Sequence, residues 1–267
     1  MKIVVCVKEI PDPDLAASIF SVDEKARKVI LPPGTRHVMS PFDAQAVEVA
    51  LRIRDALGEA AITLLCLGAE TARSIIKHGL ALGADEAILL CDPAFDDGDS
   101  FTTARSLAAA IAKIGHVDLV LTGRQAADGD LGVVGCGIGE LLNLPTVTFA
   151  ASVTVAGKTL VIERALGDGS ETVEAPMPAV VTISHEVGSV RHPSLRETMK
   201  AARKPVTMWT AKDIGLAPPD IGARGARRVL ERLYVPVSDV ECEFIRGETP
   251  GELAANLVDR LSNASLI

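Results

Sequence analysis

The chain has 267 residues, of which 48% are hydrophobic, 23% charged and 3% aromatic. This balance is that of a folded globular protein and excludes intrinsic disorder. A core so poor in aromatic rings must be packed from aliphatic side chains, as in a buried parallel sheet. The net charge of −8 argues against a general nucleic-acid binder.

The five cysteines are scattered, and none forms the Cys-x-x-Cys spacing of a metal or redox site. We therefore expect buried thiols in a reducing compartment, and no metal site. The first residues do not have the pattern of a signal peptide, and no apolar stretch reaches the roughly 18 residues that a membrane span needs. These features predict a cytoplasmic protein that is not embedded in a membrane.

Short apolar runs alternate with segments of helical periodicity through the first half of the chain. Such alternation predicts right-handed crossovers and a parallel sheet with helices on both faces, an α/β fold. Residues 8–40, with four prolines, are expected to form a functional loop or one with hairpin structure of its own. The predicted strands cover residues 3–7, 62–67, 87–91, 119–121 and 146–150, and the predicted helices residues 43–57, 70–80, 100–114 and 131–142.

The pattern changes after residue 150. Residues 153–162 predict a β-hairpin that turns at 156–158, and further strands are expected at 172–175 and 179–184. Residues 186–225 have mixed turn and basic character, and a helical pattern returns at 252–261. We interpret this part as an extended carboxyl-terminal arm with little core of its own, and such arms usually wrap around a partner.

The strongest candidate site follows the strand at 119–121. The turn after it is rich in glycine, and a helix is expected to begin near Asp130 or Leu131. Exposed backbone N–H groups at a helix amino terminus suit a phosphate, and open parallel sheets bind ligands at the carboxyl ends of their strands. The alternative is a tight turn in which Asp130 merely caps the helix.

A second helix start lies at residues 97–104, where Asp99 or Ser100 can cap and two threonines offer hydroxyl groups. Capping alone would explain these residues. The chain has neither a Walker lysine pattern nor a dinucleotide glycine fingerprint. No separated acid–base pair or nucleophile motif is present, so we expect no catalytic residue and assign any chemistry at the site to a bound cofactor.

The third candidate is the basic segment at residues 190–205. Leu195 stands among polar and basic neighbours after a proline, and a short helix is expected to run through Ala202. Leu195 is either a hydrophobic staple beside a solvated helix end or an exposed apolar anchor on a basic patch that meets acidic partners.

In combination, these segments resemble the β subunit of electron transfer flavoprotein. The resemblance covers roughly residues 1–205. It rests on the opening Ile-Val-Val-Cys-Val-Lys, on residues 39–51, on Gly-Arg-Gln-Ala-Ala-Asp-Gly-Asp at 123–130, and on Pro-Ser-Leu-Arg-Glu-Thr-Met-Lys-Ala at 193–201.

The resemblance implies an electron carrier rather than an enzyme, and an αβ heterodimer. It implies an adenine-nucleotide α-hydrolase-like domain at residues 1–190, a partner-recognition loop and helix at 191–205, and an arm at 206–267 that wraps the α subunit. FAD shared with the α subunit would take electrons from dehydrogenases, such as the acyl-CoA dehydrogenases of fatty acid oxidation. It would pass them to a membrane quinone oxidoreductase, with AMP as a structural ligand of this subunit.

Residue by residue, the resemblance implies a nucleotide site and a docking site. Partner binding is expected at Leu195, together with Arg191 and Met199. The expected nucleotide-binding residues are Cys6, Ser40, Pro41, Phe42, Asp43, Leu67, Asp99, Thr102, Thr103, Gly123, Arg124, Gln125, Ala126, Asp128, Gly129, Asp130, Leu131, Gly132, Val133 and Val134.

The chain departs from the family pattern in the phosphate loop. Many members have Thr or Gln where this chain has Leu131 or Val133 and Val134, so backbone N–H groups would have to replace those side-chain hydrogen bonds. Three alternatives remain. They are the β subunit of an electron-bifurcating flavoprotein with a second FAD in place of AMP, a stand-alone adenine-nucleotide binder of the stress-protein type, and an ATP-using ligase or hydrolase. The segment at 193–201 resembles the non-bifurcating type more closely.

Overall fold

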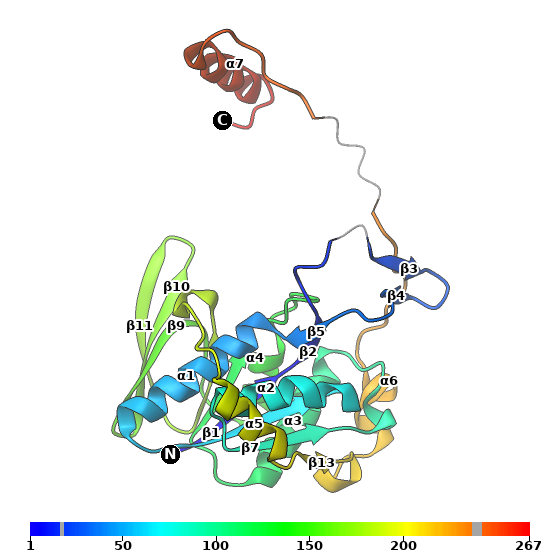
Figure 1. Ribbon diagram of the computed structural model, residues 1–267, viewed down its shortest axis with the longest axis vertical. Helices are drawn as coiled ribbons and strands as arrows, with labels where there is room; N and C mark the ends of the chain where they lie inside the picture. Colours follow the sequence, from blue (N-terminus) through cyan, green and yellow to red (C-terminus); the bar gives the residue numbers. More distant parts are fainter. Residues whose placement is uncertain (17–18, 237–241) are drawn as a thin grey trace. The chain divides into compact units, whose positions relative to one another are not determined.

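The computed structural model describes residues 1–16, 19–236 and 242–267. The chain divides into two compact units, one of residues 1–20 and 30–231 and the other of residues 21–29 and 232–267. A nine-stranded sheet with helices packed against it forms the centre of the first unit (Figure 1). This arrangement confirms the α/β class predicted from the sequence.

The strands of this sheet lie in the order β11-β10-β9-β12-β8-β1-β6-β7-β13. All neighbours from β9 to β13 are parallel, and β10 pairs antiparallel with both β9 and β11. The predicted hairpin is therefore formed by β9 and β10, and it joins the parallel strands to an antiparallel edge that ends with β11. The strands are β1 (Lys2–Val7), β6 (Ala61–Leu67), β7 (Glu86–Leu90), β8 (Leu119–Gly123), β9 (Thr146–Ala156), β10 (Thr159–Leu166), β11 (Gly169–Pro176), β12 (Ala179–Ile183) and β13 (Thr207–Trp209).

The central strands are buried on both faces, which explains their continuous aliphatic sequence. Ile3, Val5 and Val7 of β1 belong to one buried cluster. Val4 and Cys6 point the other way, into a second cluster. One face packs against α1 (Pro41–Leu57) and α2 (Arg73–Leu82), with α5 (Leu195–Arg203) on α2, and the other against α3 (Ser100–Ile114) and α4 (Val134–Leu142).

The segment expected as a loop at residues 8–40 has short strands of its own. β2 (Glu9–Pro11) pairs antiparallel with β5 (His37–Met39), and β3 (Ser21–Asp23) pairs with β4 (Lys28–Ile30). The remaining short turns of helix are η2 (Glu70–Ala72), η3 (Pro93–Phe95), η4 (His185–Val187), η5 (Lys212–Ile214), η6 (Pro218–Asp220) and α6 (Gly222–Gly225).

Residues 206–225 differ from the expected arm with little core. β13 adds a parallel strand to β7, and Ala211, Ile214 and Ile221 are buried in the second cluster. The segment consists of a three-residue strand and single turns of helix, which are too short to show a periodic pattern in the sequence. The first unit therefore extends to Glu231.

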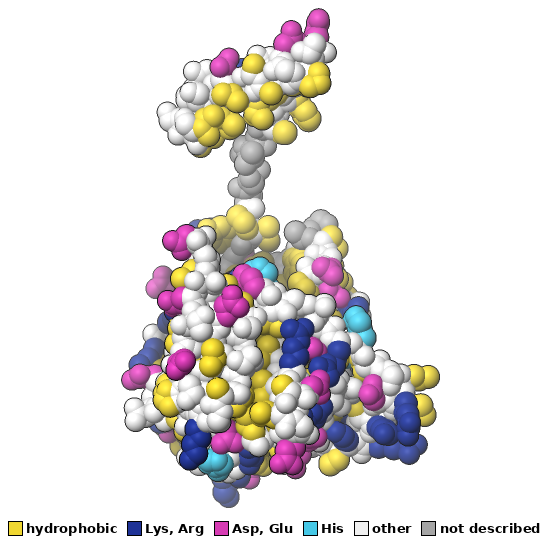
Figure 2. Space-filling view, turned by 90° about the vertical axis from the view of Figure 1, so that its left-hand side faces the viewer, with side chains coloured by type: hydrophobic (Ala, Val, Ile, Leu, Met, Phe, Trp, Pro, Cys, Tyr) yellow, Lys and Arg dark blue, Asp and Glu magenta, His cyan; other side chains and the backbone are white. Residues whose placement is uncertain are grey.

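The second unit contains α7 (Pro250–Asn263), which confirms the helix expected at 252–261. Thr249 caps it, because its hydroxyl accepts a hydrogen bond from the backbone N–H of Glu252. Its apolar side chains Leu253, Leu257 and Val258 are exposed, and hydrophobic side chains gather along one side of the helix (Figure 2). Within the described ranges, no helix combines the length and the apolar character that crossing a membrane requires.

Candidate functional site

A cleft of about 610 Å³ opens where the parallel strands β1, β6 and β8 end, in the first unit. Its walls come from those strand ends, the start of α3, the loop between β8 and α4, and residues 228–230. The predicted residues that line it are Cys6, Asp43, Leu67, Asp99, Thr103, Gly123, Arg124, Gln125, Ala126, Asp128, Gly129, Asp130, Leu131, Gly132, Val133 and Val134.

The last part of the loop between β8 and α4 presents backbone N–H groups that donate to no described group of the chain. Asp130 and Gly132 have positive φ angles of 50° and 65°, which a right-handed helix cannot include. The helix therefore begins at Val134, and not near Asp130 or Leu131 as expected, and Asp130 accepts a hydrogen bond from Gln125 Nε2 instead of capping. Among the described contacts, the backbone N–H groups of residues 131–136 donate no hydrogen bond within the chain.

Asp43 ties three elements together beneath the cleft. Its side chain is buried in α1 and accepts hydrogen bonds from the backbone N–H of Lys8 (2.8 Å) and of Gly123 (3.0 Å). Burial raises the pKa of this carboxyl group to about 7, and the two hydrogen bonds oppose that rise. Asp43 therefore fixes the ends of β1 and β8 against the amino terminus of α1.

Gly123 occupies a position where a side chain does not fit. A Cβ atom there would lie 2.6 Å from Asp43 Oδ1 and 2.7 Å from Phe42 Cβ. The close approach of β8 to α1 is what brings its backbone N–H within reach of the Asp43 carboxylate. A glycine is required at this strand end by contact with α1.

Arg124 lies between two aromatic rings at the wall of the cleft. Its Cζ atom is 5.0 Å from the ring centre of Phe42 and 5.8 Å from that of Phe149, and Nη1 donates to the hydroxyl of Ser184. Its buried Nε has no hydrogen-bond partner within the chain. An unpaired buried donor is costly unless a ligand or water satisfies it.

Four of the predicted nucleotide residues do not line the cleft. Ser40 is fully buried at the start of α1, and Pro41 and Phe42 follow it in the helix, where Phe42 supports Arg124. Thr102 is buried too, and its hydroxyl donates to the backbone carbonyl of Asp99. Ser40 and Thr102 are thus buried next to residues that line the cleft, whereas Pro41 is exposed.

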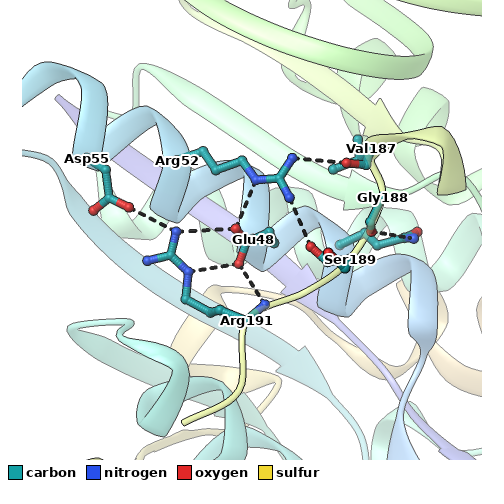
Figure 3. Close-up of polar contacts among 8 residues, drawn as sticks. Glu48, Arg52, Asp55, Val187, Gly188, Ser189 and Arg191 are labelled. Carbon is teal, nitrogen blue, oxygen red and sulfur yellow. Dashed lines mark hydrogen bonds and ion pairs between the residues drawn. The ribbon is translucent and has the colours of Figure 1, made fainter.

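The docking segment predicted at 191–205 presents an exposed surface on α5. Ser194 and Glu197 form a reciprocal capping box that begins this helix. Leu195 is 78% exposed and Met199 58%, so the structure places Leu195 as a protruding apolar side chain. The expected contribution of Arg191 differs, because its guanidinium is held by Glu48 and Asp55 of α1 (Figure 3).

Comparison with known proteins identifies the family. Residues 29–214 match the electron transfer flavoprotein domain. The chain belongs to the electron transfer flavoprotein family. It is 35% identical over 267 residues, the whole of both chains, to the caffeyl-CoA reductase-Etf complex subunit CarD of Acetobacterium woodii. It is 38% identical over 226 residues, 85% of each chain, to the electron transfer flavoprotein subunit beta of Clostridium acetobutylicum.

A third relative is the protein FixA of Azorhizobium caulinodans, 33% identical over 249 residues, which cover 90% of this chain and 86% of that protein. The family and these relatives make the chain a β-type subunit of electron transfer flavoprotein. A subunit of this kind is an electron carrier that works with flavin and an α-subunit partner.

One wall of the cleft in this β subunit comes from residues near the end of the first unit, which no pattern in the sequence indicated. Arg228, Val229 and Leu230 line the cleft. The Asp99 carboxylate holds them there, since Oδ2 accepts hydrogen bonds from the backbone N–H of Arg227 (2.7 Å) and Arg228 (3.0 Å). We name residues 227–230 the cleft strap. In the sequence, the only feature of the strap that stands out is its pair of adjacent arginines, and no local pattern indicates that they contact Asp99.

Lys8 was missed as well. It follows β1, lines the cleft, and its Nζ lies 2.6 Å from an oxygen of Asp128 in the β8–α4 loop. The sequence offered only a lysine after an apolar strand, which is common at a strand end.

Proposed function

We propose that this chain is the β subunit of a cytoplasmic αβ electron transfer flavoprotein whose cleft binds AMP as a structural ligand. In this proposal, the heterodimer carries electrons from dehydrogenases, including acyl-CoA dehydrogenases, to a membrane quinone oxidoreductase. The free backbone N–H groups at residues 131–136, at the carboxyl edge of a parallel sheet, are the observation that carries the nucleotide assignment.

The residues around the cleft fit a nucleotide. The amino terminus of α4 offers backbone N–H groups to a phosphate without needing a side-chain hydroxyl, which compensates for Leu131 and Val133. Those two side chains are exposed at the rim and supply apolar surface for a nucleoside. The unpaired Nε of Arg124 is a further donor. A cleft of about 610 Å³ has the size of ordinary small-molecule sites.

The redox chemistry in this proposal comes from FAD that the α and β subunits hold together. The side chains of this chain bind and orient the ligands, and none needs to act as an acid, base or nucleophile. Cys6 and Cys66 support this assignment, because burial raises the pKa of both thiols, that of Cys66 to about 12. Such thiols stay protonated and unreactive near neutral pH.

The α-subunit contact is assigned to the second unit. The apolar side chains of α7, and Phe244, Leu266 and Ile267 near it in sequence, are exposed in the isolated chain. A row of exposed large apolar side chains is typical of a surface that a partner covers. We therefore propose that residues 232–267 bind the α subunit, and that the arm begins after Glu231 rather than at residue 206.

The proposal is tested by co-expressing the chain with its α subunit and purifying the pair. We expect a yellow heterodimer with one FAD and one AMP, measured by the absorbance spectrum and by chromatography of the extracted nucleotides. A colourless, nucleotide-free preparation in which the chain does not bind an α subunit would overturn it.

The second candidate is a β subunit of an electron-bifurcating flavoprotein, with a second FAD in the cleft in place of AMP. The full-length similarity to a subunit of a caffeyl-CoA reductase-Etf complex favours this candidate, and the cleft volume suits the larger ligand also. Chromatography of the extracted nucleotides distinguishes this candidate from the first, because this candidate requires two flavins for each heterodimer and no AMP.

A further inference from the structure

The carboxylate of Glu48 is a buried junction between α1 and the chain that leads to α5. Its side chain is only 6% exposed. It accepts hydrogen bonds from Arg52 Nε at 2.9 Å and from Arg191 at three donors, namely Nε at 2.8 Å, Nη2 at 3.2 Å and the backbone N–H at 3.2 Å (Figure 3). Burial opposes ionisation of Glu48, but the hydrogen bonds from Arg191 outweigh it and lower its pKa.

The same junction holds the residues that precede Arg191. Arg52 Nη1 donates to the carbonyl of Val187 at 3.0 Å and Nη2 to that of Ser189 at 2.9 Å. Arg191 Nη2 also reaches Asp55 at 2.9 Å, two turns along α1 from Glu48. Two arginines and two carboxylates thus fasten residues 187–191 to a helix of the core (Figure 3).

The other end of α5 is fastened by Lys77 of α2. Its Nζ donates to the carbonyl of Ala201 at 3.1 Å, to that of Ala202 at 3.0 Å, and to that of Lys204. Carbonyl groups at the end of a helix have no partner within it, and a cation there is favourable. Lys77 therefore fixes the carboxyl end of α5 onto α2.

Between these two attachments α5 packs against α2 but buries little of its side-chain surface. Of its residues, all of which the structure describes, Ala201 is the buried one. Leu195 and Met199 point outward, with Arg196, Lys200 and Arg203 on the same short helix. A nine-residue helix does not hold its shape alone in water. The attachments at its two ends, together with its packing on α2, therefore set its direction.

We propose that Glu48 and Lys77 are positioning residues that hold the docking helix α5 in its binding orientation before a redox partner arrives. The partner surface that fits is an apolar pocket for Leu195 rimmed by carboxylates, which complement the basic residues of α5. Fixing the helix in advance removes an entropy cost from docking. The inference rests on the proposed function, in that Leu195 is the docking residue.

The test uses the FAD-loaded heterodimer with the variants Glu48→Gln, Lys77→Met and Leu195→Ala. Glu140→Gln, an exposed glutamate on α4, is the matched control for the loss of one negative charge. Hydrogen exchange of amides 192–203 is measured in the free heterodimer. We expect faster exchange there in Glu48→Gln and Lys77→Met, and no change in Glu140→Gln.

Flavin reduction by an acyl-CoA dehydrogenase is then measured at varied heterodimer concentration. We expect the KM for the heterodimer to rise about tenfold in Glu48→Gln and Lys77→Met, which corresponds to about 1.4 kcal/mol, with kcat and FAD content unchanged. A merely structural defect would lower kcat or the FAD content instead. Adding Glu48→Gln to Leu195→Ala should raise KM by much less than tenfold, because both act on one docking surface.

The two failures are distinguishable. If Leu195→Ala leaves KM unchanged, Leu195 is not the docking residue, and the docking site assigned under the proposed function is wrong. If Leu195→Ala raises KM but neither Glu48→Gln nor Lys77→Met does, or if exchange of residues 192–203 is unchanged in both, the positioning inference is overturned and the docking site stands.

Discussion

The ammonium group of Lys8 lies 2.6 Å from the carboxylate of Asp128, and this ion pair joins the end of β1 to the loop before α4. Both residues line the cleft. The pair is partly exposed to solvent, with side-chain exposures of 51% and 29%, so its contribution to stability is small, about 0–1 kcal/mol. We expect the ion pair to act mainly by restraining the conformation of the loop before α4, whose N–H groups lie at the cleft.

Lys8→Met should therefore weaken AMP binding about three- to tenfold, in line with 1 kcal/mol or so of lost loop restraint. Calorimetric titration of AMP into the nucleotide-free heterodimer measures the change. Arg36→Met, which breaks the exposed pair with Asp12 away from the cleft, is the matched control and should bind AMP as the wild type does. Equal AMP affinities for the wild type, Lys8→Met and Arg36→Met would show that the ion pair does not contribute to AMP binding.

Gly123→Ala should damage the cleft while the neighbouring Gly129→Ala does not. A Cβ at position 123 would lie within 2.7 Å of Asp43 Oδ1 and Phe42 Cβ, whereas one at position 129 meets no atom within 4 Å. Overpacking of this kind costs about 1–3 kcal/mol. Urea denaturation should show that loss for Gly123→Ala, together with a lower AMP content. A Gly123→Ala heterodimer that keeps full stability and AMP would contradict the geometry described for Asp43.

Asp43→Asn should change how stability depends on pH. Since burial raises the pKa of Asp43 from 3.8 to about 7, the native state keeps a proton that the unfolded state releases. The contribution of Asp43 to the free energy of unfolding is thus present below about pH 4 and declines as the pH rises to about 7. The total decline is roughly 4 kcal/mol, at about 1.4 kcal/mol for each pKa unit.

Asn cannot release a proton, and it offers one oxygen where the carboxyl group uses two. The variant should therefore be less stable than the wild type at about pH 5, and the difference should shrink as the pH rises to about 8. Urea denaturation of both heterodimers across this range measures the difference. A gap that stays constant or widens with pH would show that Asp43 is ionised in the native protein throughout.

Asp99→Asn should release the cleft strap, residues 227–230. Asn caps a helix as well as Asp does, so α3 should keep its start at Ser100. When the single oxygen of Asn caps α3, its NH2 group faces the N–H groups of Arg227 and Arg228 and cannot accept from either. We expect faster hydrogen exchange in the strap and AMP binding weaker by about threefold to tenfold, which is 1 kcal/mol or so.

Asp92→Asn is the control for the cleft strap. Asp92 also accepts from a local backbone N–H, that of Ala94, and from a distant one, that of Ala211, but it does not line the cleft. This variant should lose stability and keep its AMP affinity. If both variants change AMP affinity equally, the strap has no specific part in binding.

Local signals in the sequence predicted much of the fold. Helix α3 has the bounds expected, Ser100 to Ile114, because Asp99 caps its start and Gly115 follows its end. The start of α4 was misplaced by three or four residues, since the left-handed conformations of Asp130 and Gly132 depend on the turn and not on propensity. Predicting a cleft at the strand ends succeeded because parallel strands share one carboxyl edge.

Contacts between residues far apart in sequence could not be predicted. Glu48 and Arg191 are separated by 143 positions, and Asp99 and Arg227 by 128. Within its own segment, each of these four residues has the sequence context of an ordinary surface charge or helix cap. Arg191 was expected to bind a partner because its segment resembles the family's recognition loop, and nothing in that segment indicates that its guanidinium also contacts Glu48 and Asp55.

The central claim is that the N–H groups at residues 131–136 hold the phosphate of AMP. Hydrogen exchange of the nucleotide-free αβ heterodimer, with and without added AMP, tests it most directly. The account predicts that AMP slows exchange at residues 131–136 and leaves residues 192–203 as they were. AMP that binds without slowing exchange at residues 131–136, or that does not bind at all while FAD protects these residues, would contradict it.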